Sequence, residues 1–324
     1  MTMIRSDWRR VGLDFRAAVL AALGHAPEVI EPGRIQRFNT SGRASDKAGW
    51  CQLFEDGRAG VFGDFRSGMS SVWTAQRREL MTPAERADTA LRLAQAKAQR
   101  DTQQLRQQAE RAQRNAALWA NTMPVSDGDP VSLYLRRRGL AGLVPKHLRL
   151  HPRLTYWDGG DRGAWPAMVA PLVTPDGRVL ALHRTYLTAD GSKAPVPTVK
   201  KLTGAAGPLA GACIPLHDAR DGVIGIAEGI ETAQAAHLAS GLPTVAAYCA
   251  GNLAAYTWPT GIKRIVVFAD ADPAGAAAAH SLKARAVRAG LGVAVMTPST
   301  PGADWCDVWS QRGAVTVGAS EAAA

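Results

Sequence analysis

The spacing of apolar residues over the C-terminal half of the chain alternates between the period of a strand and that of a helix. Three successive units each join a short run of β-branched residues to a longer helical segment, over residues 222–241, 243–256 and 264–290. Strands that alternate with helices predict a parallel sheet, whose ligands bind at the carboxyl ends of the strands. A further strand is expected over 292–298. Residues 168–187 have the pattern of a hairpin that turns at Pro175-Asp176-Gly177.

The N-terminal third has a different pattern. A short helix is expected over residues 15–23, and the aromatic, glycine-rich segment 49–75 places turn sequences between short strand-like runs, which predicts a small β-sheet. The sequence Thr82-Pro83-Ala84-Glu85 is a capping box with proline at the first helical position. It opens a run without Gly or Pro that continues to about residue 120. Because no heptad is sustained there, we predict a long charged linker helix and not a coiled coil.

These patterns predict an α/β fold, a parallel sheet with flanking helices, preceded by a small β-rich domain and a long linker helix. We expect the following division of the chain: the β-rich domain over 1–80, the linker helix over 81–123, a further subdomain over 124–220, the α/β domain over 221–312, and a flexible tail over 313–324.

Bulk properties limit the kind of partner. Lys and Arg number 38 and Asp and Glu 28, a formal net charge of +10 that suits a polyanion such as nucleic acid. No apolar run is long enough to cross a bilayer, and the first residues lack the apolar core of a signal peptide. We therefore expect a cytoplasmic protein with no membrane partner. The four cysteines form no CxxC pair, which predicts neither a zinc site nor a disulfide framework.

Carboxylates follow the ends of the predicted strands. Glu228 follows the run VIGIA, and Asp270 and Asp272 follow IVVFA. An aspartate at this point can simply cap the next helix, with Pro273 in its first turn. One aspartate suffices for a cap, however, and a second carboxylate within reach raises repulsion unless a cation lies between the two. The spacing alone leaves metal binding and capping as alternatives.

Acidic residues recur at a third strand end, where Asp304 and Asp307 follow the segment 294–303. The carboxyl ends of parallel strands meet at one edge of a sheet, so these side chains should gather with Glu228 and the Asp270 pair. Mg²⁺ and Mn²⁺ take hard oxygen ligands of this kind. Acids at three successive strand ends therefore favour metal-assisted chemistry over capping.

The motifs that carry these acids resemble those of the Toprim domain, which bacterial DnaG-type primases share with topoisomerases, OLD-family nucleases and recombination proteins. IAEGIETA resembles the Glu motif of this family, and FADADPAGAAAA resembles its Asp-x-Asp motif. Upstream, YLRRRGL, PAMVAPLVTPDGRVLALHRTYL and VPTVKKLTG are similar, in order and spacing, to the N-terminal part of a primase catalytic core. The segments AEGIETA, AGNL and ADADPAG most resemble the corresponding motifs in Toprim primases of plasmids, phages and integrative elements. The resemblance covers residues 124–310.

Two features depart from the family pattern. Primases of this class usually carry an N-terminal zinc ribbon with three or four Cys or His ligands, but this chain offers only Cys51 in that region. We interpret residues 1–80 as a degenerate, zinc-free form whose core is apolar. The last acidic pair is spaced Asp304-Trp-Cys-Asp307 and not as the tighter Asp-Pro-Asp, which makes Asp304 the better candidate ligand of the two.

The resemblance implies a DNA primase, a nucleotidyltransferase that makes short RNA primers on single-stranded DNA from NTPs, for a mobile genetic element and beside a separate replicative helicase. Asp270, Asp272, Asp304 and Asp307 would hold Mg²⁺ or Mn²⁺. Glu228 would either bind a second ion or act as general base, and the sequence leaves both roles open. The alternatives are a Toprim nuclease in defence or recombination and a non-catalytic nucleic-acid-binding replication factor.

Basic side chains are needed opposite the acids to hold the template and the triphosphate. The candidates lie just before the Toprim segment: Arg184, Lys193, Lys200 and Lys201. We expect Arg184, Lys200 and Lys201 to face the acidic edge together. The run Arg136 to Arg138 is expected on an exposed helix face. His183 should face the side opposite Arg184 and be structural.

Overall fold

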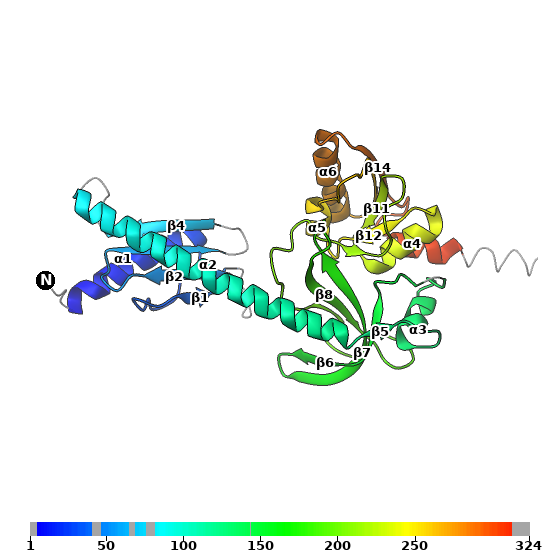
Figure 1. Cartoon of the computed structure of the whole chain (residues 1–324), viewed down its shortest axis with the longest axis horizontal. Helices are drawn as coiled ribbons and strands as arrows, with labels where there is room; N and C mark the ends of the chain where they lie inside the picture. Colours follow the sequence, from blue (N-terminus) through cyan, green and yellow to red (C-terminus); the bar gives the residue numbers. More distant parts are fainter. Residues whose placement is uncertain (1–4, 41–46, 65–68, 76–81, 143, 313–324) are drawn as a thin grey trace, which may run out of the picture. The chain divides into compact units, whose positions relative to one another are not determined.

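The computed structural model describes residues 5–40, 47–64, 69–75, 82–142 and 144–312 (Figure 1). The chain divides into two compact units, Met1–Gln104 and Leu105–Ala324, and each is described by itself. No helix in the described ranges is both long and apolar enough to cross a lipid bilayer. The tail predicted over 313–324 lies outside the described residues.

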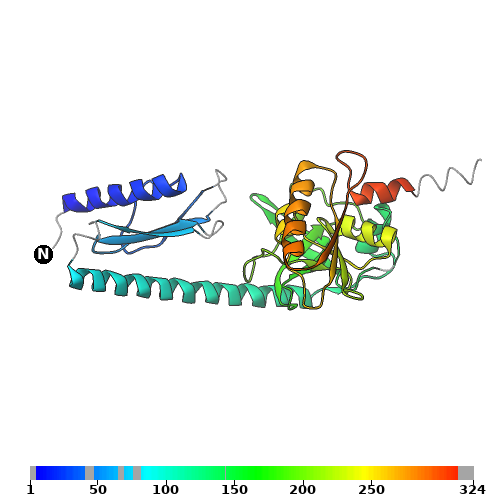
Figure 2. The same cartoon turned by 90° about the horizontal axis from the view of Figure 1, so that it is seen from above.

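The first unit is a four-stranded antiparallel sheet with a helix on each face (Figure 2). Its strands follow one another in the order β1-β2-β3-β4. Phe15 of one helix packs with Cys51 and Phe62 on one face, while Leu93 of the other helix packs against Trp50 on the opposite face. The elements are α1 (Arg5–Leu23), β1 (Gln36–Phe38), β2 (Gly49–Leu53), β3 (Ala59–Asp64), β4 (Met69–Thr74) and α2 (Pro83–Ala120).

The sequence prediction of a β-rich region followed by a long helix is confirmed. Helix α2 begins at Pro83, directly after the predicted N-cap Thr82, and the amide of Arg86 donates to the carbonyl of Thr82. The first helix is longer than the expected segment 15–23, because it begins at Arg5. The unit boundary falls within α2, at Gln104, so the finer five-part division of the chain stays a prediction.

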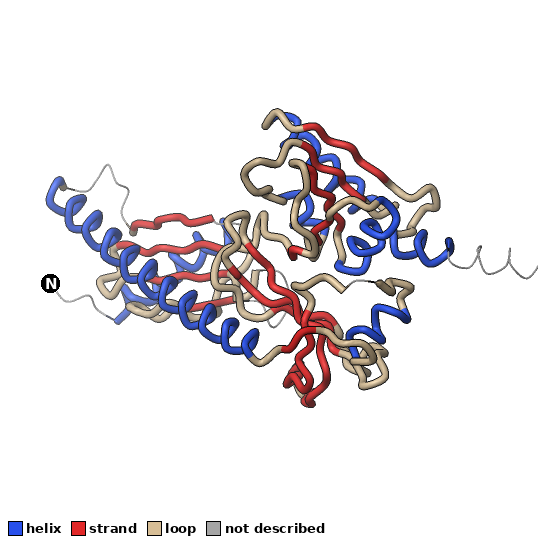
Figure 3. Tube along the Cα trace, turned by 45° about the vertical axis from the view of Figure 1, so that its right-hand side comes forward, coloured by secondary structure: helices blue, strands red, loops and turns tan. Residues whose placement is uncertain are grey.

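The second unit contains two five-stranded sheets (Figure 3). The first is antiparallel, in the order β5-β6-β7-β8-β9, and its β7–β8 hairpin turns at Gly177, which has a φ of +84° as this turn requires. Its elements, with the helix that precedes β6, are β5 (Met123–Pro124), α3 (Pro130–Arg137), β6 (Arg149–Asp158), β7 (Asp161–Val173), β8 (Val179–Tyr186) and β9 (Lys200–Leu202).

The second sheet is the predicted parallel one. Its order is β10-β12-β11-β13-β14, with parallel pairing throughout except for the short antiparallel edge strand β10. Its elements are β10 (Ile214–Pro215), β11 (Val223–Ala227), α4 (Ile230–Ser240), β12 (Thr244–Ala246), α5 (Ala250–Ala255), β13 (Arg264–Phe268), α6 (Pro273–Arg288) and β14 (Gly292–Met296). A last helix covers residues 305–312.

One continuous core joins the two sheets. Met168 and Leu180 of the antiparallel sheet belong to the same buried cluster as Ala227 and Phe268 of the parallel sheet and Tyr134 of α3. A separate cluster fills the space between the parallel sheet and helices α5 and α6. Because the first cluster is shared, the antiparallel sheet and α3 are held against the edge of the parallel sheet where its acidic loops emerge.

Candidate active site

The carboxyl ends of β11 and β13 meet at one edge of the parallel sheet. The two strands pair with Ala227 opposite Phe268, so the residues that follow them leave the sheet side by side. A cavity of about 260 Å³ lies at this edge, and its acidic lining includes Glu228, Asp270 and Asp304. The structure thus brings together one carboxylate from each of the three predicted loops.

Asp272 has a capping role beside any metal role. It is the N-cap of α6, with extended backbone, and its Oδ1 accepts a hydrogen bond of 2.6 Å from the amide of Gly275. A Cβ atom on Gly275 would lie 2.6 Å from the carbonyl oxygen of Asp270, so only glycine fits where the helix returns against the loop. The capping alternative is therefore realised by Asp272, and Asp272 does not line the cavity.

Asp270 has no such local partner. Its Oδ1 is buried and has no hydrogen-bond partner among the described residues. Burial raises the pKa of its carboxyl to about 6, and the charges of Glu228, Asp304, Asp272 and Asp307 add to the increase. The sequence places a carboxylate where the fold makes its ionisation unfavourable.

Glu228 is perturbed in the same direction. Burial raises the pKa of its carboxyl, the charge of Asp272 raises it further, and a hydrogen bond from the backbone of Ala250 opposes both. Ala250 is the first residue of α5, whose N-terminus therefore faces this carboxylate. A carboxyl with a raised pKa next to other acids is the usual condition of a group that accepts or donates a proton.

These residues fit a divalent cation. Mg²⁺ usually keeps several of its waters, so one or two carboxylates suffice to hold it. Within the described ranges, no three His, Cys, Asp or Glu side chains are placed to share one ion. Even so, the unpartnered, buried Oδ1 of Asp270 and the repulsion from its neighbours are what a bound cation would relieve. Asp270 is the best-placed ligand, and Glu228 and Asp304 are the nearest additions.

The lining of the cavity also contains basic residues. Arg138, Lys193 and Lys200 line the same cavity. Lys200 Nζ donates a hydrogen bond of 2.9 Å to Glu231, and Arg138 Nη2 lies 3.4 Å from the Sγ of Cys306. A single cavity thus holds both carboxylates and three cations, the combination of charges that a metal-bound polyphosphate requires.

Two family models match parts of the chain. Residues 223–315 match the Toprim domain, and residues 109–213 match a domain of unknown function, DUF7146. The acidic edge of the parallel sheet lies within the first of these segments. The part of this segment that the structure describes, residues 223–312, is a Toprim domain.

Several solved primase structures are similar to this chain, at low sequence identity and low TM-score. A zinc-binding and RNA polymerase fragment of Aquifex aeolicus primase is 14% identical, with a TM-score of 0.39, over 97% of this chain and 84% of that one. The RNA polymerase domain of Mycobacterium tuberculosis primase DnaG is 18% identical, with a TM-score of 0.36, over 64% and 78%. A DNA primase domain from Pseudomonas aeruginosa is 16% identical, with a TM-score of 0.34, over 49% and 52%, so the chain spans about half of its length. No curated protein matches the sequence.

Two of the predicted basic residues do not face the acidic edge of the Toprim domain. Strands β8 and β9 pair Arg184 with Lys201, which puts both side chains on the face of the sheet opposite that of Lys200. Arg184 donates to the carbonyl of Leu202, and Lys201 donates to the carbonyl of Trp157. The expectation that Arg184, Lys200 and Lys201 form one cluster is therefore wrong, because neighbouring strand residues point to opposite faces.

His183 does face the side opposite Arg184, as predicted, and this is the side of the cavity. The alternation along β8 and its pairing with β9 put His183, Thr185 and Lys200 on one face. The imidazole is 8% exposed, its Nδ1 has no partner among the described residues, and burial lowers its pKa to about 4. It is a neutral side chain on the same face of the sheet as Lys200.

Arg138 corrects a further expectation. Arg136 and Arg137 are exposed, as predicted for this run, but Arg138 is half-buried and lines the cavity. The helix α3 ends at Arg137, so Arg138 leaves the helix in its own direction. A helical pattern extended by one residue gives the wrong face.

The sequence analysis missed Glu231, Tyr134 and Tyr248, all of which line the cavity. Tyr248 has a φ of +66°, a left-handed conformation that bulky residues rarely adopt and that is concentrated at functional sites. Glu231 stands three residues after Glu228, a signal that the sequence did offer. The partner of Glu231, Tyr134, is 97 residues away in the chain and could not be found from local pattern.

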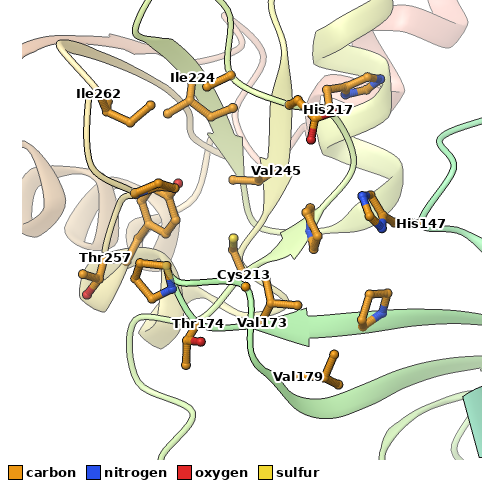
Figure 4. Close-up of a pocket in the computed structure, with 18 of the residues that line it drawn as sticks. His147, Val173, Thr174, Val179, Cys213, His217, Ile224, Val245, Thr257 and Ile262 are labelled. Atoms are coloured by element: carbon orange, nitrogen blue, oxygen red, sulfur yellow. The ribbon is translucent and has the colours of Figure 1, made fainter. Parts of the chain in front are cut away.

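A second, larger cavity of about 390 Å³ shares no lining residue with the acidic one. Figure 4 shows Val173, Cys213, Ile224 and Val245 around it, with His147 and His217 on one side. Among the described residues that line it, none is Lys or Arg, and Asp218 is the only carboxylate. Nothing in that cavity would neutralise a triphosphate, so the acidic cavity is the candidate active site.

Proposed function

We propose that this chain is a DNA primase that makes short RNA primers on single-stranded DNA by metal-dependent nucleotidyl transfer. The observation that carries the proposal is the composition of the 260 Å³ cavity, which is lined both by Glu228, Asp270 and Asp304 and by Arg138, Lys193 and Lys200. Joining two nucleoside triphosphates needs a cation-binding group beside the reacting phosphate and positive charge around the polyphosphate.

The context of the cavity supports the same reading. It lies at the edge of a Toprim domain, and the upstream sequence from YLRRRGL to VPTVKKLTG resembles the N-terminal part of a primase core in order and spacing. We further propose single-stranded DNA, NTPs and a separate replicative helicase as partners, and a mobile genetic element as the setting. The sequence likeness to primases of such elements supports these finer points.

Each acidic residue has a distinct part in the proposed reaction. Asp270 would be the principal ligand of Mg²⁺ or Mn²⁺, with Asp304 next to it and Asp272 and Asp307 reinforcing the negative edge from outside the cavity. The bound cation supplies charge neutralisation at the triphosphate and lowers the pKa of the attacking hydroxyl. Asp272 also fixes the loop, because its cap holds the first turn of α6 beside Asp270.

Glu228 would accept the proton of the attacking 3′-hydroxyl. Burial and the charge of Asp272 raise the pKa of its carboxyl, which favours proton uptake compared with an ordinary surface glutamate. In the same cavity, Arg138, Lys193 and Lys200 would contact the phosphates of the nucleotide and the template. The polar side chains of one cavity thus account for proton transfer, cation binding and phosphate binding.

One assay distinguishes this function from its rivals. The protein is incubated with single-stranded DNA, labelled NTPs and Mg²⁺, and the products are separated by length. A primase yields short oligomers, a Toprim nuclease yields shortened DNA, and a binding module yields only a mobility shift.

Two variants make the assay specific. Asp270→Asn removes the buried charge of the cavity and should abolish primer formation. Asp221→Asn is the matched control, because Asp221 is an exposed turn residue that precedes β11, at the other end of the strand that leads to Glu228. Wild-type protein that forms no oligomers, or Asp270→Asn that forms as many as the control, would contradict the proposal.

A further inference from the structure

Glu231 joins three separate elements at the wall of the acidic cavity. It is the second residue of α4, and its carboxylate is buried, with 5% exposure. Its Oε1 accepts a hydrogen bond of 2.6 Å from the hydroxyl of Tyr134 on α3. Its Oε2 accepts one of 2.9 Å from Nζ of Lys200 on β9. Both carboxylate oxygens are therefore occupied by one donor each.

The carboxylate is held in its charged form. Burial alone would raise the pKa of Glu231, but the ammonium of Lys200 and the hydrogen bonds from Tyr134 and Lys200 outweigh burial and lower the pKa to about 2. Tyr134 responds in the opposite sense: burial and the charge of Glu231 raise the pKa of its hydroxyl, so it stays a donor. The pair Glu231–Tyr134 is a fixed, anionic support inside the core.

The side chain of Lys200 is bound by Glu231 but stays partly exposed. Its side chain is 43% exposed, whereas that of Glu231 is 6% exposed. An ammonium has three donors, and the contact with Glu231 uses one, which leaves two for a ligand in the cavity. A free lysine would lose much rotamer freedom on binding a phosphate, so prior fixation lowers that entropic cost.

Lys193 lines the same cavity without such a support. Its side chain makes no hydrogen bond or ion pair with any residue in the described ranges. The loop that carries it is fixed at the backbone, since Arg137 bonds both the carbonyl and the carboxylate of Asp190. The two lysines thus differ in their support: Lys200 lies on β9 against the buried carboxylate of Glu231, whereas Lys193 lies in a loop without such a carboxylate.

We propose that Glu231 is a positioning residue, which holds the ammonium of Lys200 in place for the phosphates of a bound nucleoside triphosphate. The proposal rests on the proposed function, because it takes a triphosphate as the ligand of the cavity. Glu231 itself touches neither the ligand nor the cation. It acts only through Lys200, which separates this role from that of Glu228 three residues earlier.

A double-mutant cycle on nucleotide binding tests the proposal. The dissociation constant of ATP is measured with Mg²⁺ for wild type, Glu231→Gln, Lys200→Met and the double variant. Each single change should weaken binding about tenfold, and the double variant should bind no more weakly than Lys200→Met alone, because Glu231 acts through Lys200. A double variant about a hundredfold weaker than wild type, or Glu231→Gln that binds as wild type, would overturn the proposal.

Two further comparisons guard against a purely structural effect. If Glu231→Gln does not fold, the variants Lys200→Met and Lys193→Met still test the proposal. Lys200→Met should lose several times more ATP affinity than Lys193→Met, because only Lys200 is held by Glu231. Equal losses of affinity would contradict the proposal. Asp218→Asn serves as the control, because Asp218 pairs with Lys146 in an exposed ion pair outside the cavity. This control should bind ATP as wild type does.

Primer formation is measured on the same samples. Wild type that binds ATP with the expected cycle but forms no primer contradicts the polymerase function and supports the positioning role. Wild type that does not bind ATP overturns both.

Discussion

Asp304 and Asp307 each accept a hydrogen bond from the backbone amide of the other. The amide of Asp307 donates to Oδ1 of Asp304 at 2.8 Å, and the amide of Asp304 donates to Oδ2 of Asp307 at 3.2 Å. This reciprocal pair is a capping box at the start of the helix over 305–312. Asp304 also lines the acidic cavity, whereas Asp307 is exposed and does not. The same motif thus has one structural carboxylate and one that also faces the candidate site.

Asparagine separates capping from charge at these two positions. Asn caps helices as well as Asp does, so neither Asp304→Asn nor Asp307→Asn should change the thermal midpoint of unfolding by more than about 1 °C. Primer yield should fall roughly ten- to a hundredfold for Asp304→Asn, because the cavity loses a negative charge beside Asp270. Asp307→Asn should keep most of its activity. Equal losses for both variants would show that the cap, and not the charge in the cavity, is what matters.

Replacing Asp270 by a neutral residue should stabilise the folded protein, by an amount that depends on pH, because its buried carboxylate is unfavourable when it is charged. The pKa of this carboxyl is about 6 in the folded protein, against an ordinary value of 3.8, so the folded state binds more protons between these values. The penalty is therefore absent below about pH 4 and complete above about pH 6. Without divalent cations, the thermal midpoint of unfolding of Asp270→Asn should lie about 2 to 4 °C above that of wild type at pH 7. At pH 4 the two midpoints should be equal.

Adding Mg²⁺ checks the cause of that difference. A cation bound by Asp270 stabilises wild type but not the variant, so the gap at pH 7 should narrow as Mg²⁺ is added. Calorimetry over a pH series, with chelator and then with Mg²⁺, measures both effects. A variant that is less stable than wild type at pH 7 would mean that Asp270 has a compensating partner in solution.

The N-terminal unit should contain no zinc. Its sequence offers one cysteine, Cys51, and one histidine, His25, which cannot complete a four-ligand site. Cys51 is also fully buried between the sheet and α1, and burial raises the pKa of its thiol to about 12, so it stays protonated. Elemental analysis after extensive dialysis should find far less than one zinc per chain. A stoichiometric value would show that this interpretation of the domain is incorrect.

The sequence predicted the acidic edge because two local rules combine there. Runs of β-branched residues mark β11 and β13, and parallel strands must end at the same edge, so Glu228 and Asp270 had to lie near each other. Neither step needs information from distant parts of the chain. The long helix α2 was predictable for the same reason, since Thr82 and Pro83 mark its start and no Gly or Pro interrupts it.

The set of basic residues that line the cavity could not be predicted in this way. Whether Arg184 or Thr185 shares a face with Lys200 depends on the register of β8 against β9, and a shift of one residue reverses the answer. The support of Lys200 by Glu231 and Tyr134 depends on how three elements pack, because Glu231 is 31 positions from Lys200 and 97 positions from Tyr134 in the chain. Sequence proximity suggested one basic cluster where the fold has two separate faces.

The two faces lead to the last prediction, which compares adjacent lysines. Lys200 points to the acidic cavity, whereas Lys201 is bound to the carbonyl of Trp157 and pairs with Asp158 at 3.3 Å. Each phosphate contact with a single strand contributes about 0.7 to the slope of log affinity against log salt. Lys200→Ala should therefore flatten the slope for single-stranded DNA by about 0.7 and lower primer yield at moderate salt. Lys201→Ala should leave the slope unchanged, and its stability should fall by less than about 1 kcal/mol because the ion pair is partly exposed.

Fluorescence anisotropy of labelled single-stranded DNA over a salt series measures both slopes on the same footing. The comparison is matched in residue type, in charge removed and in strand, and the two lysines differ in the face of the sheet on which they lie and in their partners. Equal slopes for the two variants, both flatter than wild type, would mean that the template contacts both faces of β9. Slopes equal to that of wild type in both would mean that neither lysine contacts a phosphate of the template. The template contacts would then come from other basic residues, with Arg138 and Lys193 as the candidates that line the cavity.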